Sequence, residues 1–282
     1  MSIRPDQVGT RVEGHPYEVT AEEIVAFALA TNDRNPRYLA AEIAPPIYAL
    51  NPVLEPMVAA KSAVTKEFGF HGEHEIRFHR PIRAGMRLKA VASVAGVRGR
   101  SSGVAIYVTI ATHDGEGALV NEQGFISFVS NAVVSESRGE EPPRYALPGD
   151  IDSRSPAVRV DYAMDPDQTR RYAAASHDHD AYTVDEAVAR KMGFPTLLVH
   201  GMCTFAFAAR AIVNEMCGGD PERLTRIAVR LSRPVYLVPE QRLTTSIWPL
   251  GSGVSGDMSC AYTVIDAAGE TVMTNGYAEV RA

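Results

Sequence analysis

Residues 172–183 of this 282-residue chain place an acid between two proton carriers. Asp178 stands between His177 and His179, and a histidine side chain gains or loses its charge near neutral pH. A carboxylate and an imidazole that lie together can exchange protons with a reacting molecule. The competing interpretation is structural, because Asp often caps turns and helices, and loop histidines often face solvent.

This segment and residues 198–210 resemble the signature of the MaoC-like family, the (R)-specific enoyl-thioester hydratases and dehydratases. The first segment reads Tyr-Ala-Ala-Ala-Ser-His-Asp-His-Asp-Ala-Tyr-Thr, where the family has roughly Tyr-x-x-x-Ser-Gly-Asp-x-Asn-Pro-x-His. The second contains His-Gly-Met-Cys-Thr, where the family has His-Gly-x-Cys-Thr. The resemblance implies a fold, the double hotdog, and a substrate class, the acyl thioesters.

The resemblance also implies the roles of two residues. In the family, an Asp and a His add water to a trans-2-enoyl thioester, or remove it, without a cofactor or metal, and the Asp falls on Asp178. Backbone N–H groups at a helix start hold the thioester oxygen as it becomes negative, and this role falls on Gly201, with Met202 and Cys203 opening the helix. The alternatives are that Asp178 is a cap and that Gly201 only permits a tight turn.

The motif departs from the family at four positions. The catalytic His falls on Thr183, whose hydroxyl can hold a water but is no base at neutral pH. His177 stands where the family has Gly, Asp180 where it has Asn, and Ala181 where it has Pro. Because Gly often marks a backbone position with positive φ, His177 indicates a remodelled loop.

Other side chains could replace the missing base. His177 and His179 flank Asp178, although successive residues need not point the same way, and the alternative is that both face solvent. Tyr182 is a further candidate proton donor. His200 is shared with the family signature and is expected to fix the loop beneath the oxyanion site.

The first half of the chain carries a related loop. Asp33, Asn35 and Pro36 match the motif, but Tyr38 stands at the His position. The counterpart of the His-Gly pair is Ala-Pro-Pro-Ile at residues 44–47, and Pro cannot donate a backbone N–H. The resemblance therefore implies that the first half binds the acyl chain and the second half performs the chemistry. Substrate contacts are expected from Tyr182, His200, Met202, Asp33, Tyr38 and Tyr48.

The two halves echo each other in sequence. Residues 31–36, 76–82 and 120–124 recur in order as residues 176–181, 229–235 and 272–276, at a spacing of about 150 residues, which indicates an internal duplication. Residues between the halves are polar and rich in Pro, Gly and Ser, as in a linker. The predicted division is an N-terminal repeat at 1–133, a linker at 134–156 and a C-terminal repeat at 157–282.

Each half is predicted to hold two helices with the motif loop between them, followed by four strands. The expected helices are residues 21–30 and 52–68, then 165–175 and 203–216. The expected strands are residues 73–79, 87–97, 103–113 and 119–129, then 225–232, 242–250, 254–266 and 271–280, with hairpin turns at 114–117 and 266–269. The pattern alone indicates an α+β fold with two like halves. The resemblance adds two tandem hotdog repeats that form one continuous antiparallel sheet wrapped around central helices.

Composition excludes several classes of function. The chain is 45% hydrophobic and 22% charged with a net charge of −6, as in ordinary globular domains. The absence of a polybasic run argues against nucleic acid or an anionic membrane as partner, and no apolar run is long enough to span a membrane. No apolar signal segment opens the chain, and three cysteines fit neither a zinc site nor a disulfide framework, which predicts a reduced, cytoplasmic protein. The resemblance implies a homodimer.

The sequence therefore predicts a hydratase or dehydratase of an acyl or polyketide thioester, carried by CoA or by an acyl carrier protein. Two alternatives stay open: a repurposed enzyme for a cyclisation or isomerisation in natural-product biosynthesis, and a non-catalytic acyl-binding subunit. Loss of the His motivates the first alternative, whereas retention of Asp178 and Gly201 argues against the second. No Gly-rich loop or basic cluster identifies a nucleotide site, so the carrier is left open.

Overall fold

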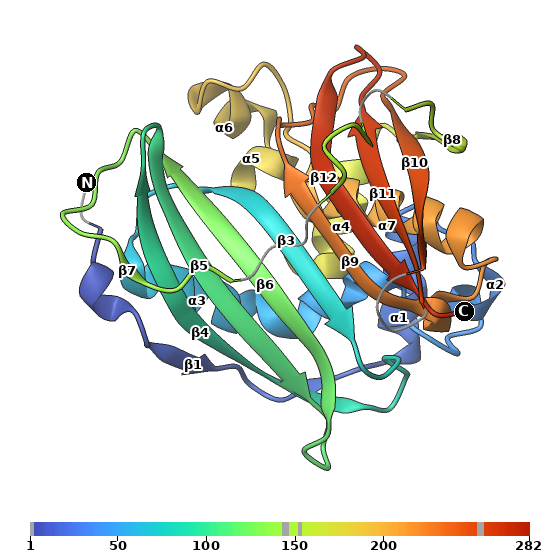
Figure 1. Cartoon of the computed structure of the whole chain (residues 1–282), viewed down its shortest axis with the longest axis horizontal. Coiled ribbons are helices and arrows are strands. Elements are labelled where there is room, and N and C mark those ends of the chain that lie inside the picture. The colour runs from blue at the N-terminus through green and yellow to red at the C-terminus, as the bar shows by residue number, and fades with distance from the viewer. Residues whose placement is uncertain (1–2, 143–146, 152–153, 253–256) are drawn as a thin grey trace. The chain divides into compact units, whose positions relative to one another are not determined.

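The computed structural model describes residues 3–142, 147–151, 154–252 and 257–282, and these residues pack into two compact units (Figure 1). The first unit comprises Met1–Glu18, Pro52–Arg80 and Met86–Ala146. The second comprises Val19–Asn51, Pro81–Gly85 and Leu147–Ala282. These packing units do not follow the predicted sequence halves, because Val19–Asn51 packs with the second unit. The division into sequence repeats stays a prediction.

An antiparallel sheet with one long helix forms the first unit. Its strands run in the order β1-β4-β5-β6-β3, and the short strands β2 and β7 also pair with β4. Side chains alternate between buried and exposed along β4, as expected for a sheet with one face on the core. Helix α3 packs against β4 and β5. The elements are β1 (Arg11–Glu13), β2 (Tyr17–Glu18), α3 (Leu54–Val64), β3 (Phe70–Phe78), β4 (Arg87–Arg100), β5 (Gly103–His113), β6 (Leu119–Ser130) and β7 (Arg138–Gly139).

The second unit holds further antiparallel strands and more helices. Its strands run in the order β9-β12-β11-β10-β8. Helix α7 packs against β8, β9 and β10, and α1 packs against α4. The strands are β8 (Val158–Ala163), β9 (Leu224–Leu231), β10 (Arg242–Ser252), β11 (Met258–Ile265) and β12 (Thr271–Val280). The helices are α1 (Ala21–Ala30), α2 (Pro36–Leu39), α4 (Gln168–Ser176), α5 (Ala181–Val184), α6 (Glu186–Lys191) and α7 (Gly201–Met216).

Helix α7 is the central helix of its unit because its sequence is apolar on nearly every side. Eleven of its 16 residues are buried, which is the pattern of a helix covered by neighbours all round. The chain leaves it through Gly218 and Gly219, both with positive φ. Helix α1 begins with a capping box, in which Thr20 and Glu23 satisfy each other's backbone N–H groups.

The predicted long elements are confirmed, with small shifts at their ends. Helix α1 has the predicted bounds, α7 starts two residues earlier, and the predicted helix 52–68 is shorter, because a 3-10 helix, Pro46–Val53, precedes α3. Both hairpin turns lie where expected. Within the predicted linker, Arg138–Gly139 forms β7, whereas residues 143–146 and 152–153 lie outside the described residues. In the part of the chain that the structure describes, no helix is long and apolar enough to cross a membrane.

Gly276 in β12 gives a test of the second sheet. It pairs with Tyr262 of β11, and a Cβ added to it would lie 2.3 Å from the Tyr262 carbonyl oxygen and 2.5 Å from the ring. We expect Gly276→Ala to lower the free energy of unfolding by about 1–3 kcal/mol, because the strands must separate to accommodate the methyl group. Urea unfolding checks this. Gly149→Ala, where a Cβ meets nothing within 4 Å, is the control. Equal stability of the two variants would contradict the close approach.

Candidate active site

The loop that carries the motif begins where α4 ends, at a residue with left-handed backbone. His177 follows the helix with φ 59° and ψ 14°, a conformation that favours glycine. The Ser176 hydroxyl donates to the Tyr172 carbonyl (2.8 Å) and accepts a hydrogen bond from the Asp178 N–H (3.3 Å). The His177 ring is exposed, with Nε2 3.4 Å from Oε1 of Glu23 on α1. The loop keeps the backbone of a glycine position, and an ion pair secures its histidine.

Asp178 is attached through its main chain to the start of α7. Its carbonyl oxygen accepts a hydrogen bond from Nε2 of His200 (3.0 Å), the residue immediately before Gly201. Its carboxylate Oδ1 accepts the N–H of Asp180 (3.4 Å). Burial raises the pKa of Asp178, the charge of Asp180 raises it further, and His200 opposes the shift. A carboxyl group with a raised pKa can hold or release a proton closer to neutral pH.

Thr183 and Tyr182 turn their hydroxyl groups toward Asp180. The Thr183 side chain is buried, and its hydroxyl donates to the Asp180 carbonyl (2.6 Å), which also accepts the Thr183 N–H (2.9 Å). Tyr182 Oη donates to the Asp180 carboxylate (2.5 Å), and burial raises the pKa of Tyr182, as does that hydrogen bond. Both hydroxyl protons are therefore occupied within the loop. His179 is exposed.

The start of α7 places backbone donors directly after His200. Among the described residues, His200 occupies the N-cap position without a side-chain capping bond, and the N–H groups of Gly201, Met202 and Cys203 begin a helix of 16 residues. A Cβ on Gly201 would lie 2.7 Å from Cδ1 of Leu231 on β9. A methyl group there would require the Leu231 side chain to move, and the φ angle of Gly201 is not left-handed. Met202 is buried, with 3% of its surface exposed.

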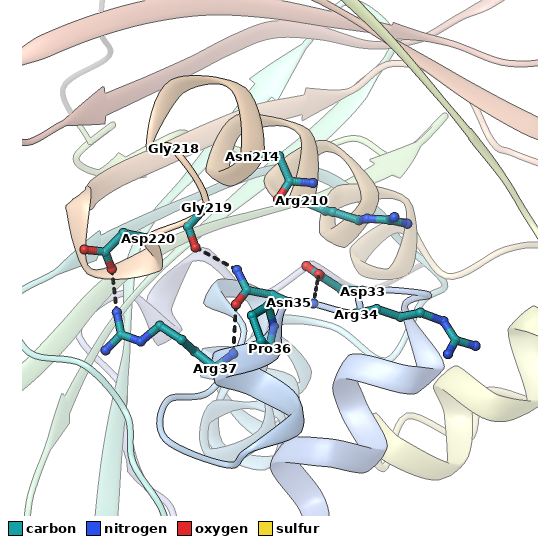
Figure 2. A pocket seen from close by; sticks show the side chains of 10 residues that line it. All are labelled: Asp33, Arg34, Asn35, Pro36, Arg37, Arg210, Asn214, Gly218, Gly219 and Asp220. Atoms are coloured by element: carbon teal, nitrogen blue, oxygen red, sulfur yellow. Dashed lines mark hydrogen bonds and ion pairs between the residues drawn. The ribbon is translucent and has the colours of Figure 1, made fainter.

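The related loop of the first half lies at the other end of α7. Asp33 is buried, with 5% of its surface exposed, and its carboxylate accepts the Asn35 N–H (3.1 Å). Burial raises the pKa of Asp33, and Arg210 on α7 opposes the shift. Figure 2 shows these residues around a polar pocket of about 620 Å³. The pocket is lined by Asp33, Arg34, Asn35, Pro36, Arg37, Arg210, Asn214, Gly218, Gly219 and Asp220.

This loop is braced against the end of α7 by polar contacts. The Asn35 amide donates to the Gly219 carbonyl (2.7 Å), and Arg37 donates to Asp220 (2.6 Å) and Glu222 (2.7 Å). Tyr38 is fully buried in a cluster with Ala28 and Ile43. Asp33 and Tyr38 thus belong to the loop at the C-terminal end of α7, whereas Asp178 is bonded to the residue before its N-terminal end. Their contacts with substrate stay predictions.

Glu23, Asn51 and Tyr172 lie near the motif loop and were not among the predicted site residues. Glu23 contacts His177 and accepts a hydrogen bond (3.3 Å) from Tyr48, which was predicted. Asn51 donates to the Ala175 carbonyl (2.9 Å) near the end of α4. Tyr172 is fully buried, and its ring centroid lies 5.0 Å from that of His200, with the two rings tilted by 50°. Glu23 and Asn51 carry no sequence signal, whereas Tyr172 is the first residue of the motif itself.

Comparison with known proteins agrees with the fold and the motif. Residues 151–269 match a family model described as MaoC like domain, and residues 6–123 match one described as FAS1-like, dehydratase domain region. The chain belongs to the MaoC-like dehydratase family. The sequence-based prediction of a hydro-lyase agrees with the names of relatives, which include a dehydratase and an enoyl-CoA hydratase. Among the described residues, no group of three or more His, Cys, Asp or Glu side chains could hold a metal ion.

Named relatives and solved structures share this family. The chain is 26% identical to 3-hydroxyacyl-thioester dehydratase Y of Mycobacterium tuberculosis, covering 88% of each. It is 27% identical to the peroxisomal multifunctional enzyme type 2 of mouse over 74% of this chain, but it spans only 27% of that protein. A MaoC-like dehydratase structure from Phytophthora capsici aligns with a TM-score of 0.83 at 21% identity, covering 99% of this chain and 98% of that one.

The double hotdog is confirmed by a further structure. An M. tuberculosis protein described as having a double hotdog fold aligns with a TM-score of 0.64 at 14% identity, covering 97% of this chain and 96% of that one. Each unit has the helix and antiparallel sheet that the prediction requires. The fold class predicted from the motif is therefore correct.

The contact between Gly201 and Leu231 can be tested by a double-variant cycle. We expect Gly201→Ala to lower the free energy of unfolding by about 1–2 kcal/mol, because its methyl group meets the Leu231 side chain. In a Leu231→Ala background the same change should cost less than about 0.5 kcal/mol. Chemical denaturation of the four proteins measures the coupling. Additive losses would show that Gly201 is not required for this packing.

The raised pKa of Asp178 predicts a pH-dependent gain in stability when the charge is removed. The folded protein favours the protonated carboxyl group, so ionised Asp178 costs stability above its unfolded pKa. Asp178→Asn should therefore raise the Tm at pH 7 by about 1–3 °C, and the gain should vanish as the pH falls to 4. Differential scanning calorimetry at both pH values tests this, with exposed Asp6→Asn as control. A Tm loss at pH 7 would mean that the charged form is stabilised.

Proposed function

We propose that this chain adds water to, or removes it from, an acyl thioester at the site where the motif loop meets the start of α7. The observation that carries the proposal is the hydrogen bond between the Asp178 carbonyl and His200, the residue that immediately precedes the N–H groups at the start of α7. Acid–base groups and preorganised donors at one place are what this chemistry requires. The names of the relatives supply the reaction class.

The proposed roles follow from the geometry. The thioester carbonyl of a trans-2-enoyl substrate accepts the Gly201 N–H, so that negative charge on its oxygen is stabilised as C3 is attacked by water. Asp178, with its raised pKa, exchanges the proton at C2. Dehydration of the 3-hydroxyacyl thioester is the same path in reverse.

CoA is the favoured carrier, because relatives are named enoyl-CoA hydratases. A carrier-protein or polyketide thioester stays a prediction, as do the homodimer and the cytoplasmic location; relatives from mouse and Arabidopsis thaliana are named as peroxisomal. The chain spans a quarter to most of the length of these relatives, so their substrates are proposals here.

Thr183 favours a second candidate function. Its hydroxyl proton is bound by the Asp180 carbonyl, so Thr183 supplies neither a base nor a free donor in place of the motif His. A site with one carboxyl group and an oxyanion position suits a cyclisation or isomerisation, or the binding of an acyl thioester without turnover. The fold alone does not decide between these functions.

A hydration assay separates the candidates. Purified protein is incubated with crotonyl-CoA and a medium-chain trans-2-enoyl-CoA, beside Asp178→Asn and Thr183→His. We expect turnover by the wild type and a loss of about 10²–10⁴ in kcat for Asp178→Asn, the range for removal of an acid–base group. An inactive wild type that Thr183→His activates would instead establish the second candidate.

A further inference from the structure

The hydrogen bond from His200 to Asp178 fixes which of its nitrogens carries a proton. A carbonyl oxygen only accepts hydrogen bonds, so His200 Nε2 is the donor over this 3.0 Å contact. In the neutral ring, Nδ1 is then a lone-pair acceptor. Nδ1 is buried and has no hydrogen-bond partner among the described residues. A buried polar atom of this kind calls for an explanation, and a bound water molecule is one of those known in folded proteins.

Tyr172 brings a complementary atom to the same place. Its side chain is fully buried, its ring centroid lies 5.0 Å from that of His200, and its Oη is also without a partner in the described part of the chain. Burial raises the pKa of Tyr172, and the Cys203 thiol and the Asp178 carboxylate raise it further, which keeps the phenol protonated. The protonated hydroxyl can donate a hydrogen bond to a water molecule, and the imidazole lone pair can accept one from it.

The two loop histidines are held differently. His177 is exposed, and its Nε2 lies 3.4 Å from Oε1 of Glu23 on α1. His179 is exposed. His200, in contrast, is 5% exposed and adjoins both Asp178 and Gly201. His200 is therefore buried and hydrogen-bonded to Asp178, whereas the two loop histidines are exposed.

We propose that His200 is the proton-transfer partner of Asp178 in this chain, replacing the histidine that the motif lacks, and that Tyr172 orients the reacting water. The inference rests on the proposed function and names a residue of that same site. During hydration, the water oxygen bonds to C3 while one of its protons passes to His200 Nδ1. The C2–C3 double bond supplies the electron pair that takes a proton from the Asp178 carboxyl group at C2. The proton on His200 then returns to the Asp178 carboxylate, so water is added and the enzyme is unchanged.

The charges around His200 suit this cycle. Burial lowers the pKa of His200, and nearby His179 lowers it slightly, whereas Asp178 and Asp180 raise it. The net shift is downward, so the ring is neutral at pH 7 and ready to accept a proton. Once it does, the Asp178 carboxylate faces the imidazolium and stabilises it. Because the pKa is lowered, activity should be lost only as the pH falls below the ordinary histidine range near 6.5.

The test uses His200→Gln, which keeps an N–H donor for the Asp178 carbonyl but cannot titrate. We expect kcat on trans-2-enoyl-CoA to fall by about 10² or more with KM within about threefold, and the acid limb of the kcat/KM profile to disappear. Tyr172→Phe, which keeps the ring, should lower kcat by about 10-fold and keep the limb. Exposed His79→Gln, which pairs with Glu122, is the control and should leave both unchanged.

The outcomes separate this inference from the function on which it rests. If wild type shows no turnover, the proposed function and the role of His200 are both overturned. If wild type is active and His200→Gln keeps kcat within about fivefold with its acid limb, only the role of His200 is overturned. Loss of the limb in His177→Gln or His179→Gln instead would also overturn it. Circular dichroism establishes that each variant is folded, and His200→Asn replaces the Gln variant if that one is not.

Discussion

The site depends on a single hydrogen bond, from His200 to the carbonyl of Asp178. It joins the loop that follows α4 to the residue that precedes α7. It connects the residue that carries the carboxyl group to the residue that precedes the first N–H groups of the helix. Because the bond is made by the main chain of Asp178, it does not occupy the carboxylate, which can exchange protons with a substrate. It also leaves the second nitrogen of His200 without a partner among the described residues, so one contact both positions Asp178 and fixes the tautomer of His200.

Burial then decides the chemistry of each group that this contact assembles. The same low-dielectric surroundings raise the pKa of Asp178 and lower that of His200, so that both move toward the neutral form. A neutral imidazole can accept a proton and a neutral carboxyl group can donate one, with no ion pair between them that must first be broken. Thr183, in contrast, takes no part in proton exchange, since its hydroxyl donates to the Asp180 carbonyl within the loop. The loop has thus gained rigidity at the position where the family has a base.

Sequence could predict what depends on periodicity and motif spacing, and not what depends on packing. The strands and α7 were predicted because their apolar patterns are long, whereas α2, α5 and α6 have four to six residues and show no period. Asp178 and Gly201 were found through the motif. The unpaired Nδ1 of His200 and the contact of His177 with Glu23 could not be predicted, because each depends on residues that folding brings together from distant parts of the chain.

The left-handed His177 has a consequence for how the loop can move. A glycine at the end of a helix crosses easily between positive and negative φ and acts as a hinge for the segment that follows. Histidine has a Cβ that narrows this choice, and its ring is further restrained by Glu23. Where the family motif has a flexible glycine, this chain has a residue with a restricted backbone. A ligand must therefore fit a loop whose shape is set before binding. Selectivity then depends on which ligands can enter the site, not on how the loop closes over them.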